Sequence, residues 1–336
     1  MTIAVSRATG TDRESWNSYV ERAPHATPFH RLEALEVLRD VSDTTLHLLV
    51  GREGEEVFGI CPLFEGSVGP FSSVRCPPTE HDVPYLGPVW LDVNHLSQRK
   101  QEMWNHQFVE AVCEWIDEEI DPDHLDIRTV DRYPDVRPFI WADLDVRPAY
   151  TYVLDLEPGP EEIKRRFSRS TRRYVRDVDD HDIAERGYEG IEYAVDQYHE
   201  RYENAGVSVE LCKALYDALP DGCVRPYVLS VDDRFVGARL TVELDDTIYA
   251  WVSAANVEEA EVPVNELVEW YAIRDAAERG LSRYDFVGGM VPSLCRYKSQ
   301  FAPVPRALYL VQRQRPWMRG ASMLYNRLPE RVRSLV

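Results

Sequence analysis

Lysine is nearly missing from this chain of 336 residues, in which four lysines stand against 34 arginines. Acidic residues outnumber basic ones by 58 to 38, which gives a net charge of −20, and they are spread along the whole chain. Such a composition keeps a protein solvated in molar salt, so we expect a halophilic archaeon as the source. The acidity therefore says little about a binding partner.

The sequence lacks the motifs of several classes of enzymes and metal-binding proteins. The six cysteines are scattered, without a C-x-x-C pair or a histidine at ligand spacing, so we expect buried free thiols and no metal site. No Walker loop, no H-E-x-x-H and no G-x-S-x-G is present. These absences argue against P-loop nucleotide hydrolysis, zinc proteolysis and the serine-hydrolase mechanism.

Targeting and membrane segments are also missing from the sequence. The N-terminal residues contain no basic stretch followed by an apolar run, so we expect no signal peptide. No apolar run approaches the length of about 18 residues that a spanning helix needs. The sequence thus predicts a cytoplasmic protein, at most attached to the inner membrane surface.

The most specific pattern in the chain lies in residues 265–301. Apolar residues at helical spacing begin after Pro263, and Gly280 ends the expected helix. A short strand run, 284–287, follows, and the glycine pair 288–289 lets the backbone turn sharply or approach a ligand closely. Such a strand end is a usual ligand site in α/β folds.

Two side chains near this glycine pair are candidates for chemistry. Lys298 could hold a phosphate, or an acyl carbonyl as negative charge develops on it; the alternative is a surface lysine on a loop. Asp285 could orient a substrate amine or act as a base, or it could cap the neighbouring turn. No metal is expected at either residue.

Alternating helix and strand patterns predict a mixed α/β (α+β) fold built from two similar halves. Proline and glycine residues between Pro148 and Pro160 mark the expected boundary, which gives domains 1–150 and 151–336. In the second half we expect one long helix over 163–178 and strands at 152–156, 224–231, 235–244, 247–253, 284–287 and 307–312.

The long helix carries an unusual concentration of positive charge. Residues 163–176 include seven basic side chains and no acid, inside a strongly acidic chain. This pattern predicts a site for phosphate groups, either those of a tRNA backbone or a diphosphate in a nucleotide- or lipid-linked saccharide. The alternative is a solvated face paired with nearby acids. The candidate ligands of an anion are Lys164, Arg169, Arg172, Arg173 and Arg176.

The chain resembles the Fem-type (FemAB-like) branch of the GNAT superfamily. The resemblance rests on NELVEWYAIRDAAERGLSRYDFVGGMVPSLCRYKSQF in residues 265–301 and is weaker in the first half. That branch includes enzymes that move aminoacyl groups from charged tRNA onto peptidoglycan precursors, and relatives described only as acetyltransferases. The resemblance implies two tandem GNAT-like domains, each with a mixed, mostly antiparallel sheet flanked by helices.

The resemblance also implies a function and a set of site residues. We expect an acyl or aminoacyl transferase that forms an amide on an amino group of a phosphate-bearing or glycan-linked acceptor. Lys298 and Asp285 are the expected catalytic residues. Besides the basic residues above, substrate contacts are expected from Asn265, Gly288, Gly289, Tyr297, Phe301 and Trp251.

The donor and the partners stay open at this point. No tightly bound cofactor is expected, and the donor is aminoacyl-tRNA or acetyl-CoA. The loop 254–263 has three glutamates and no glycine, which argues against gripping the pyrophosphate of CoA. No long heptad segment is present for a helical arm of the kind found in tRNA-reading members.

The C-terminal tail and the remaining alternatives complete the expectations. Residues 313–336 place apolar side chains, including Trp317, on one helical face and arginines on others; such a helix could lie on an anionic membrane or pack on the second domain. An acetyl-CoA-dependent N-acetyltransferase is the alternative enzyme. A non-catalytic binding module with a basic groove is the third interpretation.

Overall fold

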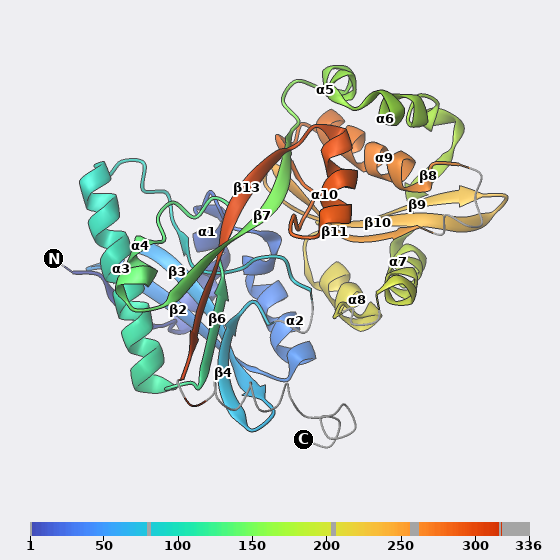
Figure 1. The fold of residues 1–336 in the computed structure, drawn as a ribbon. Coiled ribbons are helices and arrows are strands. Elements are labelled where there is room, and N and C mark those ends of the chain that lie inside the picture. Colours follow the sequence, from blue (N-terminus) through green and yellow to red (C-terminus); the bar gives the residue numbers. More distant parts are fainter. Residues whose placement is uncertain (1, 79–81, 203–205, 256–261, 316, 318–336) are drawn as a thin grey trace.

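One sheet runs through the whole molecule. The computed structural model describes residues 2–78, 82–202, 206–255, 262–315 and 317. Its 13 strands follow the order β1-β2-β3-β4-β6-β13-β7-β12-β11-β10-β9-β8, with β5 paired to β3. Only β4–β6 and β11–β12 are parallel among the described pairs. This mixed, mostly antiparallel sheet flanked by helices confirms the predicted fold class (Figure 1).

The elements divide into two groups around the sheet (Figure 1). The first group holds β1 (Ala4–Arg7), α1 (Gly10–Glu21), α2 (Leu32–Ser42), β2 (Thr45–Glu53), β3 (Glu56–Val68), β4 (Phe71–Cys76), β5 (Val89–Trp90), α3 (Gln98–Glu119), β6 (His124–Arg128), α4 (Arg137–Trp141) and β7 (Asp145–Asp155). The second holds α5 (Pro160–Arg166), α6 (Arg169–Tyr174), β8 (Asp182–Glu185), α7 (Gly187–Arg201), α8 (Val209–Ala218), β9 (Val224–Val231), β10 (Arg234–Leu244), β11 (Thr247–Ala255), α9 (Val264–Glu278), β12 (Arg283–Asp285), α10 (Pro292–Lys298) and β13 (Val304–Gln314).

Strands β7 and β13 connect the two groups. β13 pairs with both β6 and β7, and β7 also pairs with β12 through its last three residues. The predicted boundary between residues 150 and 151 therefore lies inside β7. The division into 1–150 and 151–336 stays a prediction.

Helices α7 and α9 cover opposite faces of β9–β11 (Figure 1). On one face, a Cβ added to Gly237 of β10 would lie 2.2 Å from Val264 of α9. On the other, a Cβ added to Gly190 of α7 would lie 2.9 Å from Val228 of β9. Because glycine has no side chain, each helix can lie close to the strand that it covers. Alternate residues of a strand point to opposite faces, so a sheet can bury side chains under a helix on either side.

Two hydrophobic cores flank the central strands. The first lies under α1, α2 and α3 and is built around fully buried Trp16, Trp104 and Phe108. The second lies under α5 and α9, where the Phe167 ring meets Trp270 and Phe301 edge-on, with centroids 5.2 Å apart in both pairs. This second core supports the elements that carry residues 265–301.

The predicted long helix 163–178 is wrong in one respect, because the chain breaks it into α5 and α6. Phe167 is extended, and the Ser168 side chain caps α6 by accepting from the Thr171 N–H at 3.2 Å. The Ser168 N–H donates to the Gln300 carbonyl at 2.8 Å. This tertiary contact replaces a helical hydrogen bond, and Tyr174 of α6 is 37% exposed.

The described residues place the remaining sequence expectations as follows. All six cysteines are free, and five are buried. Within the described ranges, no group of three metal-ligating side chains lies together, and no helix is long and apolar enough to cross a membrane. Of the expected tail helix, only Trp317 is described beyond Arg315, and its ring lies 5.2 Å from that of Phe71 in the first half.

Candidate active site

The sheet opens between β11 and β12. These parallel strands pair from Thr247 and Arg283 as far as Tyr249 and Asp285, where β12 ends while β11 continues to Ala255. Val287 and Gly288 then take positive φ angles of 50° and 76°, which turn the chain away from β11. A glycine accepts this conformation without strain, whereas valine needs help from its surroundings. The opening exposes one edge of β11.

A β-bulge lies at the same place on β11. The β10–β11 register changes from Leu240 opposite Val252 to Thr241 opposite Ala250, so Trp251 is an extra residue without a partner on β10. Bulges bend a strand and re-aim its side chains, and they are common beside active sites. The Trp251 Nε1–H donates to the Asp82 carbonyl at 3.0 Å, and its ring meets Phe29 at 5.3 Å.

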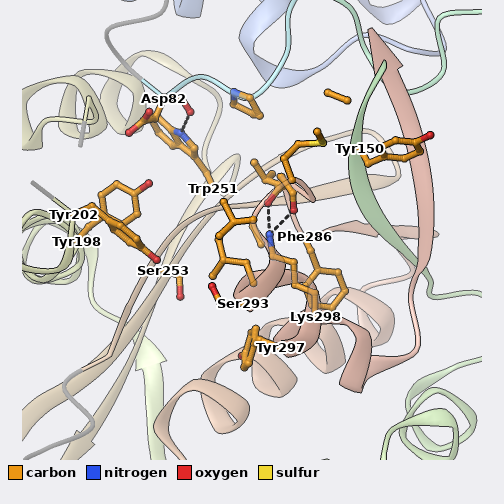
Figure 2. Close-up of a pocket in the computed structure, with 18 of the residues that line it drawn as sticks. Asp82, Tyr150, Tyr198, Tyr202, Trp251, Ser253, Phe286, Ser293, Tyr297 and Lys298 are labelled. Carbon is orange, nitrogen blue, oxygen red and sulfur yellow. Dashed lines mark hydrogen bonds between the residues drawn. The ribbon is translucent and has the colours of Figure 1, made fainter. Parts of the chain in front are cut away.

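A cavity of about 620 Å³ lies at this opening and is lined by residues from both faces of the sheet. Tyr198 of α7 and Tyr202, which follows α7, line it from one face, whereas Glu269 of α9 and Lys298 of α10 line it from the other. Figure 2 shows Tyr198, Tyr202 and Lys298 together with Trp251 and Phe286.

Lys298 fixes the turn at the end of β12. Its Nζ donates to the carbonyl oxygens of Val287 and, at 2.6 Å, of Gly288, as the dashed lines in Figure 2 show. Lys298 ends α10 and is only 8% exposed, so the structure excludes the surface-loop alternative. Burial lowers its pKa to about 8, which still leaves the ammonium form in the majority near neutral pH. Two of its three N–H groups are engaged, which leaves one for a ligand.

A buried carboxylate joins four elements beneath the cavity. Glu269 of α9 is fully buried and forms an ion pair with Arg239 of β10. It accepts a hydrogen bond from the Tyr284 hydroxyl of β12 at 2.5 Å, and its Oε2 lies 3.2 Å from the Tyr297 hydroxyl of α10. Tyr297 shares its single proton with the Asn265 carbonyl, 3.1 Å away. This network holds α10, and hence Lys298, in place.

Asp285 is fully buried and holds the turn from below. Its Oδ1 accepts from the Val287 N–H at 2.8 Å and from the Thr151 hydroxyl at 2.5 Å, and its Oδ2 accepts from the Tyr85 hydroxyl at 2.8 Å. Burial, reinforced by the charge of Asp131, raises its pKa to about 6. The contacts match the turn-capping interpretation of Asp285, and its carboxylate does not line the cavity itself.

The predicted basic residues gather in a second, shallow hollow of about 820 Å³ on α5 and α6. Arg169 and Arg176 have no carboxylate partner in the part of the chain that the structure describes, and Asp179, a candidate partner by sequence, pairs with Arg274 at 2.6 Å. The α6 face is therefore not neutralised by its own neighbours. The lining side chains are Glu161, Lys164, Arg165, Arg169, Ser170, Arg172, Arg173 and Arg176.

The structure places the other predicted residues around the cavity. Asn265, Gly288, Tyr297 and Trp251 line it together with Lys298. Gly289 and Phe301 support it instead. A Cβ on Gly289 would lie 2.8 Å from the Tyr150 carbonyl, and buried Phe301 packs on Tyr297 with ring centroids 5.5 Å apart.

Sequence reasoning missed several residues that the cavity uses. Glu269 lies one helical turn after Asn265 on the expected helix, so helix spacing could have pointed to it. Arg239, Tyr85 and the tyrosines of α7 carried no signal, because their contacts depend on how distant segments pack.

Comparisons with known proteins agree with this geometry. Residues 162–299 match the family described as acetyltransferase (GNAT) domain. That segment contains β11, β12, α9 and α10, so an acyltransferase domain of the GNAT type holds the cavity. A comparison with curated proteins finds no match.

Solved structures share the fold over nearly the whole chain. FemX is 12% identical, with a TM-score of 0.68, covering 91% of this chain and 96% of that one. L-PGS from Bacillus licheniformis is 10% identical, with a TM-score of 0.55 and coverage of 96% and 98%. A tandem GNAT protein from the clavulanic acid biosynthesis pathway is 13% identical, with a TM-score of 0.52 and coverage of 92% and 97%. The chain therefore has a Fem-like tandem GNAT fold.

Proposed function

We propose that this chain transfers an acyl group, with an aminoacyl ester as donor, onto an amino group of a phosphate-bearing or glycan-linked acceptor. The observation that carries the proposal is the opening of the sheet between β11 and β12, where a cavity reaches both faces beside a bulged strand and a buried lysine. A donor and an acceptor can enter such a cavity from opposite faces and meet at its centre.

The chemistry needs few side chains. The acceptor amine attacks the carbonyl carbon of the donor ester, the C–N bond forms, the C–O bond breaks, and the leaving alcohol takes a proton as the amine loses one. Positioning and stabilisation of the developing oxyanion supply most of the rate enhancement. The third N–H of Lys298 and the exposed edge of β11 are the donors that we assign to that oxygen. Asn265, Trp251 and Tyr297 shape the substrate contacts.

The first turn of α9 favours an aminoacyl ester over acetyl-CoA. Glu266 lies in that turn, where a carboxylate repels the pyrophosphate that a helix N-terminus would otherwise attract. Burial raises the pKa of Glu266. Most of the preceding loop, residues 256–261, lies outside the described residues, so the glycine-poor loop itself stays a sequence argument.

Phosphate groups of the acceptor are assigned to the hollow on α5 and α6. Changing Arg169, Arg173 and Arg176 together to Gln should weaken binding of inorganic pyrophosphate. It should also reduce the salt dependence of the affinity, because binding then releases fewer counterions. Arg172 is left unchanged because its Nη1 donates to the carbonyls of Arg165, at 3.0 Å, and Phe167. Isothermal titration at several KCl concentrations measures the effect.

A matched control removes the same charge elsewhere. Arg13, Arg137 and Arg147 each pair with a neighbouring acid in the first half of the chain. Their triple change to Gln should leave pyrophosphate affinity unchanged. Equal losses in both triple variants would show that net charge, and not the hollow, governs binding.

Thermal unfolding with candidate donors, followed by a transfer assay, tests the proposed function. A ligand that binds the native state raises the unfolding temperature with its occupancy, and about 100 times Kd adds about 2.7 kcal/mol. We expect stabilisation by an aminoacyl ester analogue and amide formation on an amino-sugar nucleotide. If neither an aminoacyl ester analogue nor acetyl-CoA raises the unfolding temperature, and no amide product forms, the non-catalytic binding module is favoured.

The second candidate is an N-acetyltransferase that uses acetyl-CoA. It is favoured by the match of residues 162–299 to the acetyltransferase (GNAT) domain family. A rise in unfolding temperature with acetyl-CoA, together with an acetylated amine product, would select it. Use of tRNA, contact with a membrane, a cytoplasmic location and a halophilic archaeal source all stay predictions.

A further inference from the structure

We propose that Tyr85, which belongs to the first half of the chain, is a catalytic residue of the transfer: its hydroxyl takes a proton from the acceptor amine as it passes its own proton to Asp285. The inference rests on the proposed function and adds a residue to it. Tyr85 lines the cavity, whereas the carboxylate of Asp285 lies behind it. The tyrosine is the link between a substrate in the cavity and a buried proton acceptor.

The hydrogen bonds around Asp285 are arranged for this transfer. Its Oδ1 is engaged by the Thr151 hydroxyl and the Val287 N–H, whereas Tyr85 is the one described residue that donates to Oδ2. Oδ2 therefore has a free acceptor site for an arriving proton. The Tyr85 hydroxyl shares its single proton between Oδ2 of Asp285, at 2.8 Å, and the Thr151 hydroxyl oxygen, at 3.1 Å, which leaves a lone pair of its oxygen for an amine.

The segment that carries Tyr85 is held firmly. Arg128 donates to the carbonyls of Val83 and Pro84, both at 3.2 Å, and the Thr27 hydroxyl lies 3.4 Å from the Tyr85 carbonyl. These bonds come from the first half, while the Tyr85 hydroxyl bonds to β12 in the second. A fixed backbone on one side and a fixed carboxylate on the other hold the hydroxyl within proton-transfer distance.

His30 adds a further clamp on this segment. The Thr27 N–H donates to its Nδ1 at 3.0 Å, so Nε2 carries the hydrogen and donates to the Gly87 carbonyl at 3.1 Å. Burial lowers the pKa of His30 to about 4, which keeps this neutral form at working pH. Gly87 has φ of 61°, and a Cβ there would lie 2.9 Å from the Arg128 carbonyl. The histidine thus positions the segment and does not act on substrate.

The charges around Asp285 suit a proton acceptor near neutral pH. Burial and the charge of Asp131 raise its pKa, while hydrogen bonds from Thr151, Val287 and Tyr85 lower it, to a balance of about 6. Arg283 of β12 pairs with Asp131 at 2.7 Å. Lys298 of α10 and Tyr249 of β11 interact electrostatically with the Asp285 carboxylate itself. A base with a pKa near the operating pH is the most effective one.

The proton balance closes within these groups. As the amine nitrogen bonds to the donor carbonyl carbon, its N–H proton moves to the Tyr85 oxygen while the Tyr85 proton moves to Oδ2 of Asp285. When the ester C–O bond breaks, the same path runs in reverse and returns the proton to the leaving alkoxide. Tyr85 thus ends as a neutral phenol and never carries a full charge, consistent with burial raising its pKa well above the usual value.

The test is the pH dependence of kcat and KM for the wild-type chain, Tyr85→Phe, Asp285→Asn and the double variant. In the wild type, kcat should rise with pH through the pKa of Asp285 at about 6. Tyr85→Phe should lower kcat by roughly 10²-fold or more and abolish this rise, with KM unchanged. Because the two residues act in series, the double variant should be no slower than Asp285→Asn alone.

Tyr133→Phe is the matched control. It removes another buried phenol hydroxyl of the first half, which donates to Asn105 at 2.9 Å, and Tyr133 does not line the cavity. We expect it to keep the wild-type kcat and the wild-type rise of kcat with pH. The Tyr85→Phe variant should unfold near the wild-type temperature, because its ring still packs on Tyr249, 6.2 Å away.

Three outcomes decide between the possibilities. Wild-type kcat in Tyr85→Phe, equal losses in Tyr85→Phe and Tyr133→Phe, or additive losses in the double variant would each overturn the inference and leave Tyr85 as a support for Asp285. Absence of any transfer by the wild-type chain would instead overturn the proposed function, and the inference with it.

Discussion

Lys298→Ala should lose transfer activity by about 10² to 10³-fold in kcat while the fold is kept. The change removes the one N–H that remains for the developing oxyanion, and it frees the carbonyls of Val287 and Gly288 that shape the turn. Both carbonyls border the cavity, so water can replace the lost bonds. Steady-state kinetics and circular dichroism measure the two parts of this prediction.

The pH dependence of kcat is an independent test of the role of Lys298. Because burial lowers the pKa of Lys298 to about 8, kcat should fall as the pH rises above that value and the ammonium loses its proton. Lys213→Ala is the control, since this lysine pairs with Glu192 on the outer side of α7 and α8. Full activity in Lys298→Ala, or an equal loss in Lys213→Ala, would remove Lys298 from the site.

Glu269→Ala should be the most destabilising single change at the site. It leaves the buried guanidinium of Arg239 without its charge partner and the Tyr284 hydroxyl without its acceptor, while the Tyr297 hydroxyl keeps the Asn265 carbonyl alone. Breaking a buried ion pair from one side costs about 3–5 kcal/mol, because the remaining charge stays desolvated. Denaturant unfolding measures the loss of stability. Activity should fall as well, because the Glu269 network holds Tyr297 and therefore the next residue, Lys298.

Two further variants separate pairing from simple truncation in the Glu269 prediction. Glu192→Ala breaks a solvent-exposed pair with Lys213 and should change the free energy of unfolding by about 0–1 kcal/mol. The double variant Arg239→Met/Glu269→Leu should be more stable than Glu269→Ala, because no unpaired charge remains. If the double variant is as unstable as Glu269→Ala, the ion pair is not what the network depends on.

Local patterns predicted much of the second half correctly. The strand at 224–231 has the bounds of β9, and α9 ends before Gly280, whose φ of 87° is easy for glycine alone. The expected break between the strands at 224–231 and 235–244 is a turn in which Asp232 and Asp233 take positive φ angles. These features depend on residues within one or two turns of each other, which a single sequence contains in full.

The errors and omissions share a different physical origin. The helix 163–178 breaks because Gln300, more than a hundred residues later, accepts a bond from Ser168. Tyr85 reaches Asp285 across 200 positions of sequence. β13 joins β6 to β7, so the last described strand completes the centre of the sheet. No periodicity or composition encodes which distant segments meet.

The sequence by itself determined the fold class, the glycine pair, the lone lysine near it and the basic residues of 163–176. These follow from backbone preference, hydrophobic period and charge, which are properties of neighbouring residues. Only the tertiary structure decided that Lys298 is buried, that Glu269 meets Arg239, and that Tyr85 faces the cavity. Strand register and helix packing bring these polar groups together, and a buried polar group must find its partner wherever the chain places one.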